Sequence, residues 1–262
     1  MDCGSESNRV RLTAPNSLGI YFSIIDNDFG RYSENRKLSF TGGEPMSEKR
    51  PIRRLLEGVQ RFHDKEFPRE HILFEHLASG QHPHTLFITC ADSRIVPELI
   101  TQTAPGELFV CRNIGNIVPP YRESPCEITA VMEFACTHLG VSEIVVCGHS
   151  DCGAMKALQS PAATKHMPAV ATWLRNAATV WDAVESTAPD LEGAEECHAL
   201  VAQNVRTQLA NLRTHPAVAA RIADGTIEIH GWVYDIGAGS ISVFDADERE
   251  LLPMESVLAQ LQ

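Results

Sequence analysis

The sequence predicts an α/β fold: a mostly parallel central sheet with flanking helices, an antiparallel edge strand and an N-terminal helical arm. Short apolar runs alternate with longer segments of helical periodicity, which is typical of βαβ units around a parallel sheet. The chain has 262 residues, of which 44% are hydrophobic and 21% charged, enough for one globular domain with a short addition. Two of the apolar runs end in clusters of cysteine, histidine and aspartate.

The predicted arm is an amphipathic helix at the start of the organised sequence. Its apolar side chains recur at helical spacing, with arginine and glutamate between them: Ile52, Leu55, Leu56, Val59 and Phe62. A second helical segment follows at 71–77 and leads to Gly80.

Five apolar runs are expected to form strands. They cover residues 85–89, 108–111, 144–147, 227–234 and 241–244. Helical patterns lie between several of them, at 128–139, 169–184 and 200–212. The run at 85–89 is too apolar to expose either face to water, so both faces of this strand should be covered. Gly237 and Gly239 separate the last two runs by a short turn, which predicts a hairpin that adds the antiparallel edge.

Residues 1–48 differ from the rest in composition. Serine, asparagine, arginine and glycine are frequent there, and no apolar period is sustained. We therefore predict a flexible N-terminal extension over residues 1–48, with a targeting role as the alternative, and a single domain over residues 49–262.

Charge and cysteine content exclude several function classes. The net charge is −12 and the pI about 5.3, so the surface lacks the basic stripe that nucleic-acid binding requires. The longest apolar runs fall far short of the roughly 20 residues that span a membrane, so we expect no membrane partner. The eight cysteines do not form the framework of a short secreted chain. We interpret them as reduced thiols in the cytoplasm.

Two clusters of polar residues follow predicted strands. Cys90-Ala-Asp-Ser-Arg94 follows the run at 85–89, and His149-Ser-Asp-Cys152-Gly153 follows the run at 144–147. Ligand sites in open α/β sheets are built where strands end. Catalytic zinc takes three ligands from thiolate, imidazole or carboxylate groups and keeps a fourth position for water. Cys90, His149 and Cys152 would together make such a site, although Cys90 alone is equally well explained as a small buried hydrophobe.

Together, the two clusters resemble the two signature motifs of the β-class carbonic anhydrases. The similarity continues through four further segments: Gln81-His-Pro83, Pro105-Gly-Glu-Leu-Phe109, Arg112-Asn-Ile-Gly-Asn116 and His230-Gly-Trp-Val-Tyr234. It covers roughly residues 52–253 and is greatest to the bacterial and cyanobacterial branch that includes the anhydrase associated with cyanate breakdown.

The resemblance implies a zinc enzyme that reversibly hydrates carbon dioxide to bicarbonate and a proton. One zinc ion per chain would be held by Cys90, His149 and Cys152, and zinc-bound hydroxide would attack carbon dioxide. The family's catalytic pair matches Asp92 and Arg94. When Arg94 holds Asp92, the carboxylate accepts the hydroxide proton, and when Arg94 lets go, Asp92 binds zinc as a fourth ligand in a closed state. We expect acid to favour the closed state and activity to rise between about pH 7 and 8.5.

Four substrate contacts also follow from the resemblance: Gln81, Phe109, Ile114 and Gly153. Gln81 matches a donor to a substrate oxygen. Phe109 and Ile114 match apolar pocket walls, with plain core packing as an equal alternative. Gly153 matches a glycine whose missing side chain leaves room near the zinc.

Two positions depart from the patterns of the family. Phe134 stands where plant-type members have a tyrosine, so a hydrogen bond is lost there. Phe87 stands where some bacterial members hold an inhibitory bicarbonate with a tryptophan, and we therefore do not expect that regulatory site.

The resemblance further implies a homodimer or tetramer with the pocket at the seam between subunits. Gln81 and Phe109 would then reach the zinc of the neighbouring subunit. The helix from Ile52 would wrap a partner chain, with packing on its own sheet as an equal alternative.

Three other interpretations stay open at this point. Some relatives of the fold hydrolyse carbon disulfide or carbonyl sulfide with the same metal. A structural zinc or thiol-redox role would use Cys90 and Cys152, but the chain lacks the Cys-x-x-Cys spacing of redox pairs, and such a role has no use for Asp92 and Arg94. The N-terminal extension could also make the chain a subunit of a carbon-fixing or cyanate-degrading assembly.

Overall fold

The computed structural model describes residues 50–122, 126–245 and 247–260. The predicted extension over residues 1–48 lies outside the described residues, so the expected boundary after residue 48 stays a prediction. The chain divides after Pro68 into two compact units, and the second runs from Arg69 to Gln262. No helix in the described part of the chain is long and apolar enough to cross a membrane.

The first unit contains the predicted N-terminal helix. α3 (Pro51–Arg61) has proline in its first turn, where a missing N–H costs no helical hydrogen bond, and continues into the π-helical turn η1 (Phe62–Glu66). Arg53 donates to the Glu57 carboxylate at 3.0 Å, one turn further along. The apolar side chains of α3 are 58–65% exposed within this chain: Ile52, Leu55, Leu56 and Val59. The amphipathic helix is confirmed, and what covers its apolar side stays a prediction.

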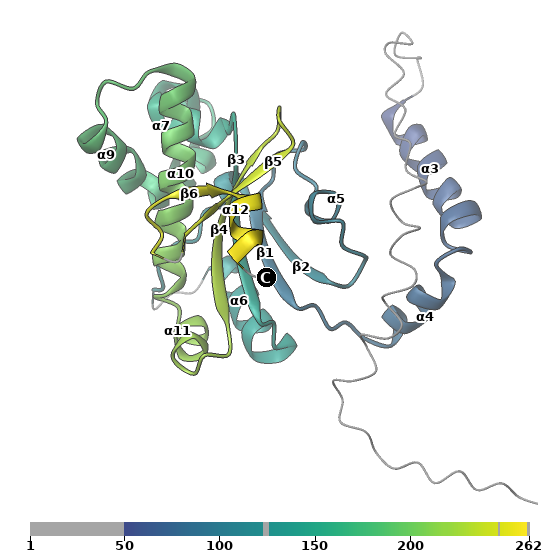
Figure 1. Ribbon diagram of the computed structural model, residues 1–262. Coiled ribbons are helices and arrows are strands. Elements are labelled where there is room, and N and C mark those ends of the chain that lie inside the picture. The colour runs from purple at the N-terminus through teal and green to yellow at the C-terminus, as the bar shows by residue number, and fades with distance from the viewer. Residues whose placement is uncertain (1–49, 123–125, 246, 261–262) are drawn as a thin grey trace, which may run out of the picture. The chain divides into compact units, whose positions relative to one another are not determined.

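The second unit is built on a six-stranded sheet in the order β2-β1-β3-β4-β5-β6 (Figure 1). Its strands are β1 (Thr85–Cys90), β2 (Leu108–Asn113), β3 (Glu143–His149), β4 (Glu228–Asp235), β5 (Ser240–Phe244) and β6 (Leu251–Pro253). The strands β1 to β4 run parallel, whereas β5 and β6 pair antiparallel. The predicted sheet and its antiparallel edge are confirmed. β6 has only three residues and was not predicted from the sequence.

β1 is buried on both faces, as its apolar run predicts. It has a parallel neighbour on each side and is buried at all six positions. Leu86 and Ile88 join the core cluster on one face, and Phe87 joins a smaller cluster on the other.

Helices flank this sheet. They are α4 (His71–Ser79), α5 (Pro97–Thr101), α6 (Glu127–Glu133), α7 (Gly153–Gln159), α8 (Pro168–Leu174), α9 (Ala178–Thr187), α10 (Gly193–Leu212), α11 (Pro216–Ala223) and α12 (Met254–Gln260). Single helical turns are η2 (Ile114–Asn116), η3 (Phe134–Leu139), η4 (Pro161–Thr164) and η5 (Arg175–Ala177). Four helices of five to eight residues are too short for a periodic pattern and were not predicted from the sequence: α5, α7, α11 and α12.

The helical pattern at 169–184 is two helices in the structure. α8 ends at Leu174 and α9 begins at Ala178, with η5 between them. The Asn176 amide donates to the carbonyl oxygen of Trp173 at 2.9 Å. An asparagine that satisfies a carbonyl of the preceding turn competes with helix continuation, and apolar spacing does not reveal this competition.

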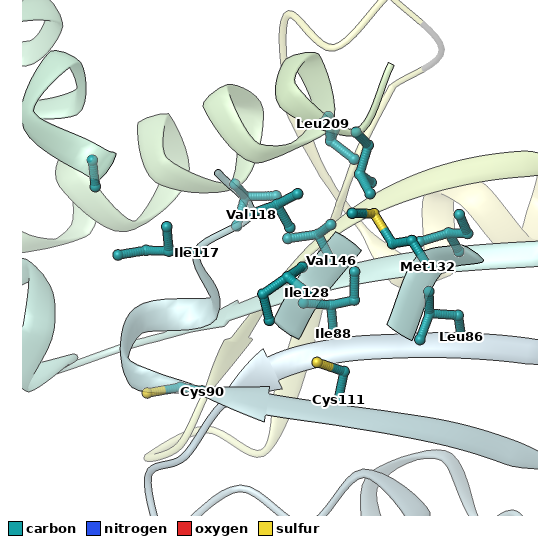
Figure 2. Packing of buried hydrophobic residues seen from close by; sticks show 14 of the residues in the cluster. Leu86, Ile88, Cys90, Cys111, Ile117, Val118, Ile128, Met132, Val146 and Leu209 are labelled. Atoms are coloured by element: carbon teal, nitrogen blue, oxygen red, sulfur yellow. The ribbon is translucent and has the colours of Figure 1, made fainter. Parts of the chain in front are cut away.

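α10 lies against β3 and β4 (Figure 1). Its residues Val201, Val205 and Leu209 are at most 1% exposed, and Figure 2 shows Leu209 within the core cluster. Two glycines in the strands permit this close approach. A Cβ on Gly148 would lie 2.8 Å from Val205, and one on Gly231 would lie 2.8 Å from Leu209. Burial of each such α10 side chain stabilises the fold by roughly 1.5–3 kcal/mol.

Buried amide side chains on α10 fix the loop that follows β2. Asn204 Nδ2 donates to the Gly115 carbonyl oxygen at 2.9 Å, and Gln208 Oε1 accepts from the Val118 N–H at 2.9 Å. Asn211 Nδ2 donates to the Val118 carbonyl oxygen at 2.8 Å. Gln208 also donates to Asn204 at 2.8 Å, so the amides hold one another. These contacts satisfy the backbone of a loop that has no partner strand.

His215 is a buried ionisable residue that follows α10. It is 2% exposed, and its Nε2–H donates to the Pro119 carbonyl oxygen at 2.9 Å. The Tyr121 ring lies edge-on to the imidazole, with the ring centres 5.7 Å apart. Burial lowers the pKa of His215 below its usual value, so the folded chain favours the neutral imidazole.

Replacing His215 with glutamine is expected to reduce the loss of stability in acid. The unfolded chain binds a proton at His215 below about pH 6.5, whereas the folded chain resists it, so this residue lowers the free energy of unfolding as the pH falls. Glutamine keeps a donor for Pro119 and does not titrate. Between about pH 8 and pH 5.5, the urea midpoint should fall further in the wild type than in His215→Gln. Equal falls would contradict a neutral buried imidazole.

Candidate metal centre

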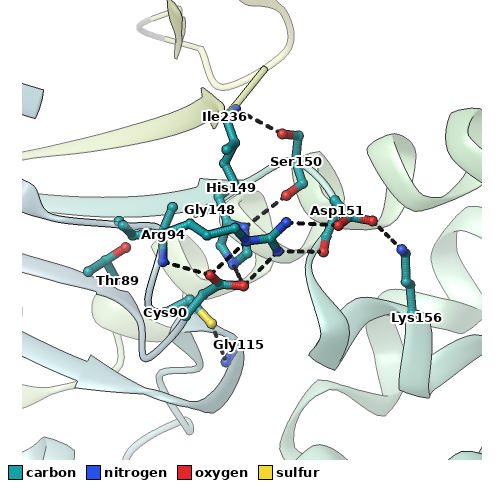
Figure 3. Close-up of polar contacts among 12 residues, drawn as sticks. Thr89, Cys90, Arg94, Gly115, Gly148, His149, Ser150, Asp151, Lys156 and Ile236 are labelled. Atoms are coloured by element: carbon teal, nitrogen blue, oxygen red, sulfur yellow. Dashed lines mark hydrogen bonds and ion pairs between the residues drawn. The ribbon is translucent and has the colours of Figure 1, made fainter. Parts of the chain in front are cut away.

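Three potential metal ligands meet where two neighbouring parallel strands end. β1 ends at Cys90 and β3, its parallel neighbour, ends at His149. Cys152 follows three residues later as the N-cap of α7. The ligand atoms of these residues all lie within 4.8 Å of one another, and all three residues are buried. The cluster expected from the sequence is therefore assembled, and Figure 3 shows Cys90 beside His149.

Hydrogen bonds determine which nitrogen of His149 faces the other two ligands. The Nδ1–H donates to the carbonyl oxygen of Ser150 at 2.9 Å, which leaves Nε2 with a lone pair. Ser150 is itself anchored, because its N–H donates to the Tyr234 carbonyl oxygen at 2.8 Å and its hydroxyl accepts from the Ile236 N–H at 3.0 Å. Nε2 is buried and has no hydrogen-bond partner among the described residues. An orphaned lone pair of this kind fits a metal ligand.

The two cysteines share their charge unequally. The neighbouring Cys152 thiol and the Gly115 N–H stabilise the thiolate of Cys90 and lower its pKa below the usual value despite burial. The thiolate formed there raises the pKa of Cys152 far above its usual value. The chain alone therefore holds one negative charge on two sulfurs, and a cation between them is what allows both to ionise.

This donor set fits zinc. Two thiolates and one neutral imidazole are soft and borderline ligands, which zinc accepts and magnesium or calcium do not. Three protein ligands leave a fourth position, which is the arrangement of catalytic zinc sites; structural sites use four protein ligands.

Asp92 and Arg94 form a two-point ion pair beside these ligands. Arg94 Nε donates to Asp92 Oδ1 at 2.9 Å, and Arg94 Nη2 donates to Asp92 Oδ2 at 2.7 Å. These bonds hold the pKa of Asp92 well below its usual range. Asp92 Oδ2 lies 3.9 Å from His149 Nε2, so the carboxylate borders the position that a metal would take. The structure thus shows the arrangement in which Arg94 holds Asp92.

Arg112 fixes the loop that carries Asp92. Its Nε donates to the Cys90 carbonyl oxygen at 3.2 Å, and its Nη2 donates to the carbonyl oxygens of Asp92 at 2.7 Å and Ile95 at 2.8 Å. The Gly115 N–H donates to the Cys90 sulfur at 3.4 Å, which adds a second contact from the same segment. Arg112 belongs to a sequence motif, but its role could not be predicted, because a pattern does not show which carbonyls a side chain binds.

Two of the four expected substrate contacts lie beside the ligands. Ile114 precedes Gly115, is 42% exposed and has its carbonyl oxygen held by Trp173 Nε1 at 2.8 Å. Gly153 follows Cys152 directly, and a Cβ built there would meet nothing within 4 Å in this chain. The role of Gly153 beside the substrate stays a prediction.

The other two expected contacts lie toward the opposite end of β1. Phe109 pairs in register with Leu86, near the start of β1, whereas Cys90 at its end pairs with Asn113. At about 3.3 Å per residue, the four residues from Phe109 to Asn113 span roughly 13 Å. Gln81 precedes the start of β1 and is exposed. Phe109, and Gln81 beyond it, are therefore remote from this chain's own cysteine along the strand.

At both positions that depart from the family pattern, the phenylalanine ring packs against other rings. Phe134 is 43% exposed and packs against Phe109, with ring centres 5.8 Å apart, and against His138 at 4.7 Å. Phe87 is 1% exposed and lies edge-on to Trp232 at 5.8 Å. A phenylalanine at either position offers no hydrogen-bond donor.

Asp151 has a contact that the sequence analysis did not anticipate. It lies inside the second polar cluster, between His149 and Cys152, but was given no role. Its carboxylate accepts a hydrogen bond from Arg94 Nη1 at 2.9 Å. The sequence shows only that an acidic residue lies between two ligands. Its partner, Arg94, is identified only when the fold brings the two strand ends together.

Comparison with known proteins finds relatives for most of the chain. A family model described as carbonic anhydrase matches residues 85–241. A carbonic anhydrase of Pseudomonas aeruginosa is 48% identical over 203 residues, which cover 78% of this chain and 92% of that protein. Carbonic anhydrase 1 of Escherichia coli O157:H7 is 47% identical over the same shares, 78% and 92%. A carbonic anhydrase of a Synechocystis species is 41% identical and covers 80% of this chain and 77% of that protein.

Solved structures agree with these relatives. The β-carbonic anhydrase CcaA is 41% identical, with a TM-score of 0.75, over 77% of this chain and 98% of that one. A β-carbonic anhydrase of the fungus Sordaria macrospora, described as tetrameric, is 32% identical with a TM-score of 0.68, over 74% and 97% of the two chains.

Replacing Cys152 with serine is expected to abolish tight zinc binding. Serine keeps the size of the side chain but does not supply the thiolate that the cluster needs, so the affinity should fall at least 100-fold, as an order of magnitude. Metal analysis after dialysis, with competition against a chromophoric chelator, measures the change. Cys136→Ser is the matched control, because Cys136 is also buried but lies outside the cluster. Equal zinc affinity in both variants would show that the metal binds elsewhere.

Proposed function

Because this chain belongs to the β-carbonic anhydrase family, we propose that Asp92 and Arg94 are the catalytic pair of its zinc site. The chain is a carbonic anhydrase: it interconverts carbon dioxide and bicarbonate, with a proton released on hydration. The position of Asp92 carries the proposal. Its carboxylate is paired with Arg94 at two points and lies 3.9 Å from the orphaned nitrogen of the ligand His149.

The chain's own residues have separate tasks in this reaction. Cys90, His149 and Cys152 would hold the zinc ion, which supplies a Lewis acid that lowers the pKa of bound water toward about 7. Arg94 keeps Asp92 ionised throughout the neutral range, so the carboxylate acts only as an acceptor. Asp92 Oδ2, on the side of His149, accepts a hydrogen bond from the reacting water and orients its lone pair toward carbon dioxide.

A closed state is part of the same proposal. If Asp92 left Arg94, its carboxylate would be free to join Cys90, His149 and Cys152 as a ligand and to exclude water from the site. The closed state needs no ionised water, so acid favours it. Arg94 therefore has two tasks, since it keeps Asp92 charged and also keeps it away from the metal ligands.

Hydration is expected to be slow in acid and to rise between about pH 7 and 8.5. Asp92 does not titrate over that range, because Arg94 holds its pKa well below the usual value. In Asp92→Asn the charge that Arg94 holds is lost, and kcat/KM should fall by about 10²–10³-fold.

Stopped-flow hydration with a pH indicator measures both effects. Asp182→Asn is the control, because Asp182 is an exposed carboxylate on α9. A profile that is flat across this range, or an Asp92→Asn enzyme as fast as the control, would refute the assigned roles.

We also propose that the active unit is a homodimer or a higher oligomer in which Gln81 and Phe109 complete the site of the neighbouring subunit. The register of β1 and β2 supports this, because Phe109 lies roughly 13 Å along the sheet from the strand end that carries Cys90. The exposed ring of Phe134 next to Phe109 and the apolar side of α3 also suit a subunit contact. The Sordaria relative described as tetrameric agrees with such an assembly.

Two defective variants should complement each other if Gln81 acts across a subunit contact. Gln81→Ala keeps the metal ligands, and Cys152→Ser keeps Gln81, so a mixed dimer contains one complete site. Random pairing on co-expression makes half of the dimers mixed, and activity should recover to about a quarter of the wild-type value. Activity that stays at the average of the two separate variants would place Gln81 in its own subunit's site or outside the site altogether.

A cytoplasmic location is part of the proposal, with carboxysomal association as the alternative. All seven cysteines in the described part of the chain are free, which suits a reducing compartment: Cys90, Cys111, Cys126, Cys136, Cys147, Cys152 and Cys197. Fractionation of the source cells distinguishes free enzyme from enzyme that sediments with carbon-fixing shells.

A further inference from the structure

We propose that Asp151 is a positioning residue for the catalytic pair. It fixes the Arg94 guanidinium from the side opposite Asp92, and Lys156 in turn holds the Asp151 carboxylate. The inference rests on the proposed roles of Asp92 and Arg94 and adds a second carboxylate to them. Figure 3 shows dashed contacts from Arg94 to Asp151 and from Asp151 to Lys156.

Arg94 is held on both sides. Toward the metal ligands, its Nε and Nη2 donate to the two carboxylate oxygens of Asp92. Away from them, its Nη1 donates to Asp151 Oδ2 at 2.9 Å and its Nη2 donates to the Asp151 carbonyl oxygen at 3.2 Å. All three guanidinium nitrogens are therefore used, and the plane of the group is fixed at four points.

The backbone of Asp151 presents both of its acceptors to Arg94. Its φ is +59°, a left-handed conformation that is uncommon for residues other than glycine and that aspartate tolerates better than most. Here the strained backbone lies between two metal ligands and directs a carbonyl and a carboxylate at the same guanidinium. Conformations of this kind persist where the surroundings require them, and they cluster at functional sites.

Lys156 holds the far side of Asp151. It lies on α7, and its ammonium group pairs with Asp151 Oδ1, the carboxylate oxygen that Arg94 does not use. Charges thus alternate along a row from Asp92 through Arg94 and Asp151 to Lys156. Without Lys156, the Asp151 carboxylate would be held only by Arg94, the residue that it positions.

Stability does not explain this row. The side chains of Arg94, Asp151 and Lys156 are 42%, 54% and 52% exposed, and ion pairs this exposed contribute little to folding. What the row does is limit the movement of Arg94. An Arg94 that is free on its outer side can rotate with Asp92 or away from it, and Asp92 then turns toward the metal ligands more often.

The test uses cobalt in place of zinc and a small anion, thiocyanate, as the probe at one fixed alkaline pH. Cobalt reports through its visible spectrum whether the fourth position is open to the anion or filled by a protein carboxylate. In Asp151→Gly, thiocyanate should bind about tenfold more weakly and kcat for hydration should fall by a similar factor. Lys156→Met should show a smaller change in the same direction.

The controls separate positioning from folding. Glycine adopts the positive φ of Asp151 without strain, so Asp151→Gly should fold and bind metal normally. If it does not, Lys156→Met decides alone, since the substitution changes only an exposed side chain and leaves the backbone bond from Lys156 to the Cys152 carbonyl oxygen in place. Lys165→Met is the matched control, because Lys165 is another exposed lysine. Asp151→Asn, which keeps acceptors for Arg94 but loses the charge, should lie between the wild type and Asp151→Gly.

The outcomes distinguish this inference from the function on which it rests. If Asp92→Asn and Arg94→Ala are impaired while Asp151→Gly and Lys156→Met match Lys165→Met in spectrum and rate, the positioning role is overturned and the catalytic pair stands. If Asp92→Asn and Arg94→Ala are themselves unimpaired, the catalytic pair is wrong. A shift of thiocyanate affinity in Asp151→Gly and Lys156→Met, absent from Lys165→Met, supports the inference.

Discussion

The parallel pairing of β1 with β3 is the constraint on which the site depends. The carboxyl ends of neighbouring parallel strands lie side by side. Cys90 and His149 therefore meet, although 58 residues separate them in the sequence. The turn after β3 then adds Cys152 at the start of α7. Without a metal, one of the two sulfurs keeps its proton, whereas a metal ion binds both sulfurs as thiolates. Metal binding is therefore coupled to deprotonation of Cys152, whose pKa the Cys90 thiolate raises.

Other parts of the second unit hold the ends of β1 and β3 in place. α10 packs closely on β3 because Gly148 leaves space for Val205, and its buried amides hold the loop that donates to the Cys90 sulfur. Arg112 donates to the carbonyl oxygen of Asp92 and so holds the loop that carries this residue. The ligands are thus supported by contacts that themselves touch no substrate. This is the second layer of interactions that metal sites generally need, because ligands that move lose affinity and geometry.

The sequence predicted the parts of this structure that depend on local pattern. The apolar run at 85–89, the glycine-bounded hairpin and the two polar clusters were placed correctly because alternation, turn residues and strand ends leave signals in the sequence. The break in the helix at Asn176 and the short helices left no such signal. The contact between Arg94 and Asp151 also could not be predicted, since it depends on how two strand ends are oriented. Gln81 and Phe109 were expected to reach the zinc of a neighbouring subunit; the register of β1 and β2 places Phe109 away from the strand end that carries Cys90, and the contact across subunits stays a prediction.

The most direct test of the account is a zinc titration of metal-free protein followed by stopped-flow hydration of carbon dioxide. The account predicts no rapid hydration before zinc is added, a linear rise, and a plateau at about one zinc per chain, with no rise in Cys152→Ser. Rapid hydration by the metal-free chain, or a chain that binds one zinc at this cluster and stays inactive at alkaline pH, would contradict it.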